Sequence, residues 1–214
     1  MRTSVDVSQA LLARAVPHEV VRLARRISCA DELPGALGLV DGCVAVRLYA
    51  VSRGGRRSWA AVLVPSGADP DPCALAAALG SDDVRPATVA ETNAVTGFPA
   101  GLVSPAGLPP GVEVLADAAI GRTDVVYAAA GEGGVAVGVR TRDLLVAAGA
   151  RAATLSPAPG AAPRFADIVE LDPRSAEGWA ADPAAGPAAA DPASTDPAGR
   201  TAVPARGDRH RRYG

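Results

Sequence analysis

The segment 96–111, TGFPAGLVSPAGLPPG, concentrates the residues of this sequence that are able to form a binding site. Within it, 97–111 holds four glycines and four prolines, and long loops inside compact domains tend to be functional. Glycine permits backbone conformations that other residues resist, whereas proline fixes φ and removes a backbone donor. Such a loop is irregular yet stiff, and it can present backbone N–H and C=O groups to a small ligand. The alternative interpretation is a plain connecting loop.

Side chains of the usual catalytic kinds are scarce. The chain has two histidines, His18 at the start of an expected strand and His210 near the end. It contains no G-x-S-x-G elbow, no H-E-x-x-H helix and no Walker A sequence, so a Ser-His-Asp hydrolase and a P-loop site are not expected. The run GEGG at 131–134 lies between two expected strands, which favours a hairpin turn over a phosphate cradle. Three widely spaced cysteines predict neither a zinc site nor disulfides, and we expect no metal and no cofactor.

The net charge of −2 excludes a globally basic nucleic-acid binder and argues against DNA as a partner. The first 60 residues nevertheless carry nine arginines against five acidic residues, which leaves room for a local patch facing RNA phosphates. The candidates for this patch, with a solvated face as the equal alternative, are Arg14, Arg22, Arg25 and Arg26. No apolar run of about 18 residues and no signal-peptide pattern is present, which predicts a cytoplasmic protein without a membrane span.

The hydrophobic pattern and the turn signals predict one domain of mixed helices and strands. We expect helices at 8–16, capped by Ser8, and at 28–38, 71–79, 88–95 and 142–148. Strands are expected at 18–24, 43–53, 58–65, 84–87, 112–116, 124–130 and 135–140. Gly54-Gly55 turns the first hairpin, and Thr88 with Glu91 forms a helix capping box. Because only 3% of the residues are aromatic, the core must consist of valine, leucine and alanine.

The composition changes near Ser156, after which proline, alanine, glycine and aspartate dominate. We therefore expect a domain at 1–155 and a mostly disordered tail at 156–214, because such a tail cannot bury enough apolar surface to offset its ordering entropy. Within the tail, 164–171 is the stretch most able to pack on the domain, and 206–214 is basic.

The loop and its surroundings resemble one known family. TGFPAGLVSPAGL is similar to the tGy-x-x-G-x-x-x-P loop of the YbaK-type aminoacyl-tRNA deacylases, which include the editing domain inserted in bacterial prolyl-tRNA synthetases. The segments GCVAVRLYAV, AAVLVPSG, LAAALG, VEVLAD, AAAGEGGVAVG and TRDLL follow the order of family segments, so the likeness covers about 8–155. It implies an α+β fold with a mixed, barrel-like sheet surrounded by helices. It also implies hydrolysis of the ester that joins a mischarged amino acid to tRNA, in trans because no synthetase core is present.

The resemblance also implies site residues. Gly101 and Pro105 are the catalytic loop positions, and water, assisted by the terminal ribose hydroxyl, attacks the ester while backbone dipoles stabilise the oxyanion. The family lysine aligns with Val46. The neighbouring Arg47 could replace it catalytically only through a bulge or a register shift, because successive strand side chains point to opposite faces. The alternative for Arg47 is a solvent-facing strand residue. The implied substrate-binding residues are Gly97, Phe98, Leu102, Val103, Ser104, Val46, Asp117 and Gly131.

Three of these assignments leave alternatives open. Asp117 either orients the loop or caps the next turn, and Gly131 is expected to serve its hairpin. The loss of the lysine makes an inactive module, binding aminoacyl-tRNA or a protein partner, the alternative to an active deacylase.

Overall fold

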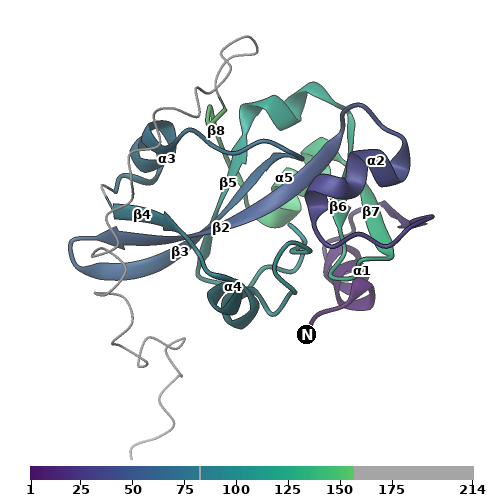
Figure 1. Ribbon diagram of the computed structural model, residues 1–214, viewed down its shortest axis with the longest axis horizontal. Coiled ribbons are helices and arrows are strands. Elements are labelled where there is room, and N and C mark those ends of the chain that lie inside the picture. The colour runs from purple at the N-terminus through teal and green to yellow at the C-terminus, as the bar shows by residue number, and fades with distance from the viewer. Residues whose placement is uncertain (82, 157–214) are drawn as a thin grey trace, which may run out of the picture. The chain divides into compact units, whose positions relative to one another are not determined.

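The computed structural model describes residues 1–81 and 83–156, and its centre is a mixed β-sheet (Figure 1). In the described residues the strand order is β1-β7-β6-β2-β3-β5-β8, and β4 pairs with β2 beside this path. Pairs β2–β6, β3–β5 and β5–β8 are parallel, and the other pairs are antiparallel. The strands are β1 (His18–Arg22), β2 (Cys43–Arg53), β3 (Arg56–Pro65), β4 (Asp83–Pro86), β5 (Val112–Asp117), β6 (Val125–Ala129), β7 (Val135–Arg140) and β8 (Arg151–Ala153).

Helices connect these strands, and the predicted class, a mixed sheet with packed helices, is confirmed. The α-helices are α1 (Ser4–Leu12), α2 (Leu33–Leu37), α3 (Pro72–Leu79), α4 (Val89–Thr96) and α5 (Thr141–Ala148), and the 3₁₀ helices are η1 (Ala30–Glu32) and η2 (Ala118–Arg122). None of the described helices has the length and apolar character needed to cross a bilayer. The expected tail lies outside the described residues, apart from Ser156.

The hairpin of β2 and β3 forms as its sequence predicts. Two β-branched, apolar runs meet at Gly54-Gly55, whose positive φ angles of 56° and 79° suit a tight turn. The register runs without interruption from Val44 opposite Pro65 to Arg53 opposite Arg56. Because that ladder contains no bulge, alternate residues of β2 point to opposite faces throughout.

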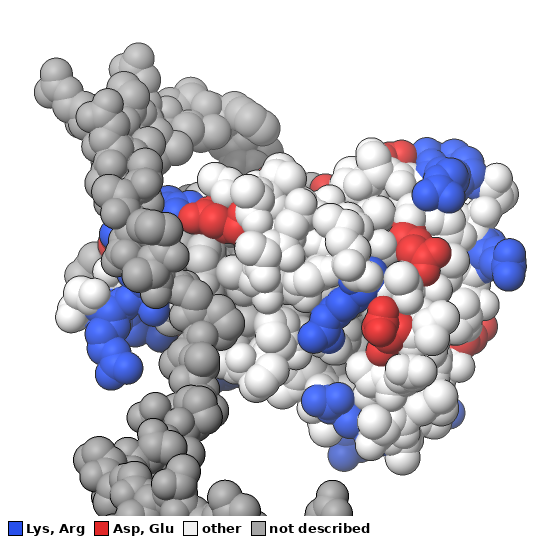
Figure 2. Space-filling model, turned by 90° about the horizontal axis from the view of Figure 1, so that it is seen from below, with Lys and Arg blue, Asp and Glu red and all other residues white. Residues whose placement is uncertain are grey.

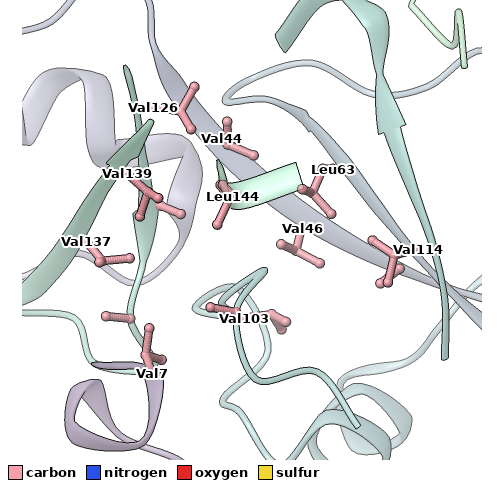
Figure 3. Packing of buried hydrophobic residues seen from close by; sticks show 14 of the residues in the cluster. Val7, Val44, Val46, Leu63, Val103, Val114, Val126, Val137, Val139 and Leu144 are labelled. Atoms are coloured by element: carbon pink, nitrogen blue, oxygen red, sulfur yellow. The ribbon is translucent and has the colours of Figure 1, made fainter. Parts of the chain in front are cut away.

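The two faces of β2 belong to separate hydrophobic cores. We call the first the Val46 core; it includes Val46, Leu63, Val103, Val114 and Leu144 (Figure 3). The second, on the opposite face, we call the Ala45 core; its buried members include Cys43, Ala45, Val62, Leu33, Leu75 and Leu102. Both are dominated by valine, leucine and alanine, as the low aromatic content predicts, and Phe98 is the one aromatic ring among their fully buried members in the described residues.

Several predicted helix limits need correction. Helix α1 begins at Ser4 instead of at a Ser8 cap, because Thr3 and Asp6 form a capping box and Val7 is buried in the same turn. The helix expected at 28–38 is divided into η1 and the short α2, with proline in the first turn of α2. By contrast, Thr88 and Glu91 form the predicted capping box of α4. Strand β8 and helix η2 were not predicted; each is too short to show a hydrophobic period.

Candidate functional site

The Gly/Pro loop after α4 is folded into the protein instead of lying on its surface. Phe98 and Ser104 have no exposed surface, and Val103 is 2% exposed. Local hydrogen bonds shape the loop: Ala100 N–H donates to the Asn93 side chain at 2.7 Å, and Leu102 N–H donates to a loop carbonyl at 2.9 Å. The loop is therefore a packed element that brings its backbone into the interior.

Gly101 is the point at which this loop meets the segment before η1. Its φ is +85°, and its carbonyl accepts a hydrogen bond from Ala30 N–H at 2.8 Å. A Cβ at this position would lie 2.8 Å from the carbonyl oxygen of Ser28 and 3.2 Å from Cβ of Cys29. Both the conformation and the close backbone approach thus require glycine here.

Gly131 joins the turn between β6 and β7 to the same loop. Its N–H donates to the Leu102 carbonyl at 3.1 Å, and its φ is +81°. A Cβ on Gly131 would lie 2.6 Å from the Arg2 carbonyl oxygen and 3.0 Å from the Phe98 ring. Gly131 therefore serves more than the hairpin, because the loop and the N-terminal residues pack directly over it.

Backbone donors at the centre of the loop are left without partners. Within residues 1–81 and 83–156, the N–H groups of Gly101, Val103 and Ser104 make no hydrogen bond. Val103 and Ser104 are buried, and buried N–H groups without a partner are rare in native proteins. The Ser104 hydroxyl accepts from Ala106 N–H at 3.3 Å. The loop thus offers several unused donors to a carbonyl oxygen or an oxyanion.

Val46, which the resemblance aligns with the family lysine, lies on the loop side of β2. It is 8% exposed and belongs to the same core as Val103, and Figure 3 shows both side chains directed into this interior. The chain has no lysine, and among the described residues the only buried charged side chain is Asp117. No buried cation therefore takes the place of the lysine beside the loop in this part of the chain.

Arg47 points to the opposite face of the sheet. Its Nη2 donates to both carboxylate oxygens of Asp31 at 2.9 Å, and its Nε donates to Asp69 at 3.2 Å. Burial works against the charged form of Arg47, but the two carboxylates outweigh it and raise its pKa. Neither the bulge nor the register shift that a catalytic Arg47 requires is present, so its contacts are those of a residue that anchors η1 to β2.

Asp117 lies at the end of β5 and is 3% exposed. Its carboxylate accepts from Ala119 N–H at 2.9 Å, as the N-cap of η2, and from the Ser156 hydroxyl. Within the described residues it makes no hydrogen bond to the 97–111 loop. Of the two alternatives, the structure shows the cap.

The predicted arginine patch is only partly free of acidic partners. Arg25 pairs with Glu32 at 2.8 Å, and Arg14, just after α1, donates to the Ala10 carbonyl at 3.2 Å. Arg22 and Arg26 have no carboxylate within 4.0 Å among the described residues. Figure 2 shows that the basic side chains on the face it presents form separate groups with uncharged surface between them.

One residue of the site carries no signal in the sequence. Arg2 donates its backbone N–H to the Gly97 carbonyl at 2.7 Å and its Nη1 to the Gly107 carbonyl. Its guanidinium lies 5.8 Å from the centre of the Phe98 ring. An arginine near a chain end is ordinary by type and spacing, so only the folded structure identifies this contact.

The best-defined cavity of the described residues lies away from the loop. It measures about 280 Å³ and is lined by residues at the start of β2, around η2 and in β6, including Val44, Ile120 and Val126. No residue of 97–111 lines it. Two of its lining residues, Val44 and Val126, also belong to the Val46 core. Val44 lies on β2, two residues before Val46.

Comparisons with known proteins agree with this architecture. The model of the aminoacyl-tRNA editing domain family matches residues 48–147, which include the loop, Asp117 and Gly131 but begin after Val46 and Arg47. A candidate trans-editing enzyme for prolyl-tRNA synthetase is 25% identical, with a TM-score of 0.63 over 72% of this chain and 97% of that one. A hypothetical protein, APE2540, is 24% identical, with a TM-score of 0.64 over 71% of this chain and 99% of that one.

The comparison with curated proteins finds no match. The family match and the shared fold nevertheless confirm the resemblance seen in the sequence. Residues 48–147 belong to the aminoacyl-tRNA editing domain family, the YbaK family.

Proposed function

We propose that this protein is a trans-editing aminoacyl-tRNA deacylase, which hydrolyses the ester of mischarged tRNA. The observation that carries the proposal is the set of unpartnered N–H groups at Gly101, Val103 and Ser104 in a buried loop of an editing domain. Donors fixed in a buried place stabilise a developing oxyanion strongly, because they need no reorganisation during the reaction.

The chemistry follows from those donors. The ester carbonyl oxygen would accept from the loop N–H groups, and the negative charge that forms when water attacks would strengthen these hydrogen bonds. The hydroxyl of the terminal ribose would help to activate the water, so the protein need supply no side-chain nucleophile. Gly101 keeps the loop close to the Ser28–Ala30 backbone. Pro105 has no backbone N–H, so the series of loop donors ends at Ser104.

The direct test is a hydrolysis assay with a panel of mischarged tRNAs and the purified protein. We expect at least one of them to be hydrolysed well above its spontaneous rate. If every member of the panel decays at the spontaneous rate, the deacylase proposal fails.

A second candidate, a module that binds aminoacyl-tRNA or a protein partner without catalysis, is favoured by the surroundings of Val46. Val46 lies among apolar side chains, and Arg47 is engaged on the opposite face. The discriminating variants are Val46→Lys, with Val46→Met as a control for added length, and Gly101→Ala. If none of them changes hydrolysis while binding of tRNA persists, the module is the better description.

We also propose that the domain 1–155 carries this function and the tail does not. Leu155 has no exposed surface, so the packed part of the chain extends to that residue. A protein that ends after Ser156 keeps the contact with Asp117 and should retain hydrolysis and binding. Loss of both in this truncated but folded protein would assign the function to the tail.

A further inference from the structure

Arg2 holds both ends of the segment 97–107. Its backbone N–H donates to the carbonyl of Gly97, where α4 ends, and its guanidinium donates to the carbonyl of Gly107. Gly101 and Pro105 lie between these two points. A single residue therefore closes the segment that carries the candidate donors, which reduces the number of conformations open to it.

The Arg2 guanidinium also covers the Phe98 ring, at 5.8 Å from the ring centre. Phe98 is fully buried, and its edge would touch any Cβ placed on Gly131. A cation over an aromatic face and a charge-assisted hydrogen bond to a carbonyl are both attractive, and here they act on the same loop. Arg2 thus fixes the loop against the β6–β7 turn.

The backbone of Arg2 is held in place independently of its side chain. Ser4, two residues later, donates its N–H and its hydroxyl to the Glu132 carboxylate, each at 2.9 Å. These hydrogen bonds lower the pKa of Glu132, because they favour its charged form. A substitution at Arg2 therefore removes the bond to Gly107 while the N-terminal segment stays anchored.

We infer that Arg2 is a positioning residue, which keeps the N–H groups of Val103 and Ser104 directed at the reacting carbonyl. The inference rests on the proposed deacylase function for its catalytic part. Its structural part, the ordering of the loop by the Arg2 side chain, stands on the contacts alone.

The test compares Arg2→Met, which keeps an unbranched apolar stem, with Arg2→Lys and with Arg56→Met. Arg56 is a matched control because it is exposed at the start of β3, far from the loop in the sequence, and lies outside the candidate arginine patch. We expect Arg2→Met to lower kcat about tenfold with KM changed less than about twofold, because the loop donors act mainly in the transition state. Arg2→Lys should recover part of this loss, and Arg56→Met should match the wild type.

Amide hydrogen exchange gives a readout that needs no activity. In Arg2→Met we expect Val103 and Ser104 to exchange about tenfold faster than in the wild type, with the β2 and β3 amides unchanged. Wild-type exchange and wild-type kcat in this variant would overturn the inference. If the wild-type protein hydrolyses no mischarged tRNA, the proposed function fails separately, and exchange alone decides the inference. In that case, wild-type exchange in Arg2→Met would overturn it. Arg2→Gln replaces the methionine variant in the same comparison if the latter does not fold.

Discussion

Replacing Gly101 by alanine tests the structural basis of the candidate site. A residue with a Cβ at φ +85° has a strained backbone, which costs about 1–2 kcal/mol. The added Cβ would also lie 2.8 Å from a backbone atom, the Ser28 carbonyl oxygen, and forcing extra volume into a packed site costs about 1–3 kcal/mol more. We therefore expect Gly101→Ala to lower the free energy of unfolding by about 2–5 kcal/mol.

The matched control is Gly111→Ala at the end of the same loop. Gly111 has a similar φ of +92°, but no atom lies within 4 Å of the position that a Cβ would take there. Gly111→Ala should therefore lower the free energy of unfolding only by the cost of the strained backbone, about 1–2 kcal/mol. Urea unfolding measures the stability of both variants. With a slope of about 2 kcal/mol/M, the midpoint of Gly101→Ala should fall by about 1–2.5 M.

Hydrolysis should respond in the same order. The loop of Gly101→Ala must move away from Ser28, and a displacement of about 1 Å can lower a rate about a hundredfold. The rate per folded molecule should therefore fall at least tenfold in Gly101→Ala and stay near the wild-type value in Gly111→Ala. If the two variants are equally stable, the close approach at Gly101 does not constrain the loop, and the reasoning is refuted.

Two further predictions concern the elements around the loop. Gly133→Ala would place a Cβ against the Ile27 carbonyl oxygen and should lower the free energy of unfolding by about 2 kcal/mol. Gly134→Ala is the control, because no atom lies nearer than 4.0 Å to its added Cβ, and it should change that free energy by less than about 1 kcal/mol. Urea unfolding measures both variants. Hydrogen bonds from Arg85 and the α4 cap lower the pKa of Glu91 from 4.5 to about 2, so its charged form stabilises the fold above pH 4.5 and this contribution disappears as the pH falls toward 2. Glu91→Gln should therefore be less stable than the wild type by about 1 kcal/mol at pH 7 and equal to it near pH 2, and a difference that does not change with pH would contradict this account.

Local features of the sequence predict much of this fold. The β2–β3 hairpin follows from two apolar runs and Gly54-Gly55, and α4 follows from Thr88 and Glu91, because turn and cap preferences act over a few residues. The same local reasoning identifies the glycine- and proline-rich loop. It fails at α1, where a cap at Thr3 and the burial of Val7 override the weaker cap at Ser8.

The site itself depends on contacts that local reasoning cannot provide. Alternation along β2 determines that Val46 and Arg47 face opposite ways, but only packing decides that Val103 covers the side of Val46. Gly131 and Arg2 reach the loop from distant parts of the chain through backbone groups. Contacts between backbone atoms that are far apart in the sequence leave no pattern of side chains. Residue types and spacing therefore identified the loop as the candidate site, and only the tertiary structure decided which residues hold it in place.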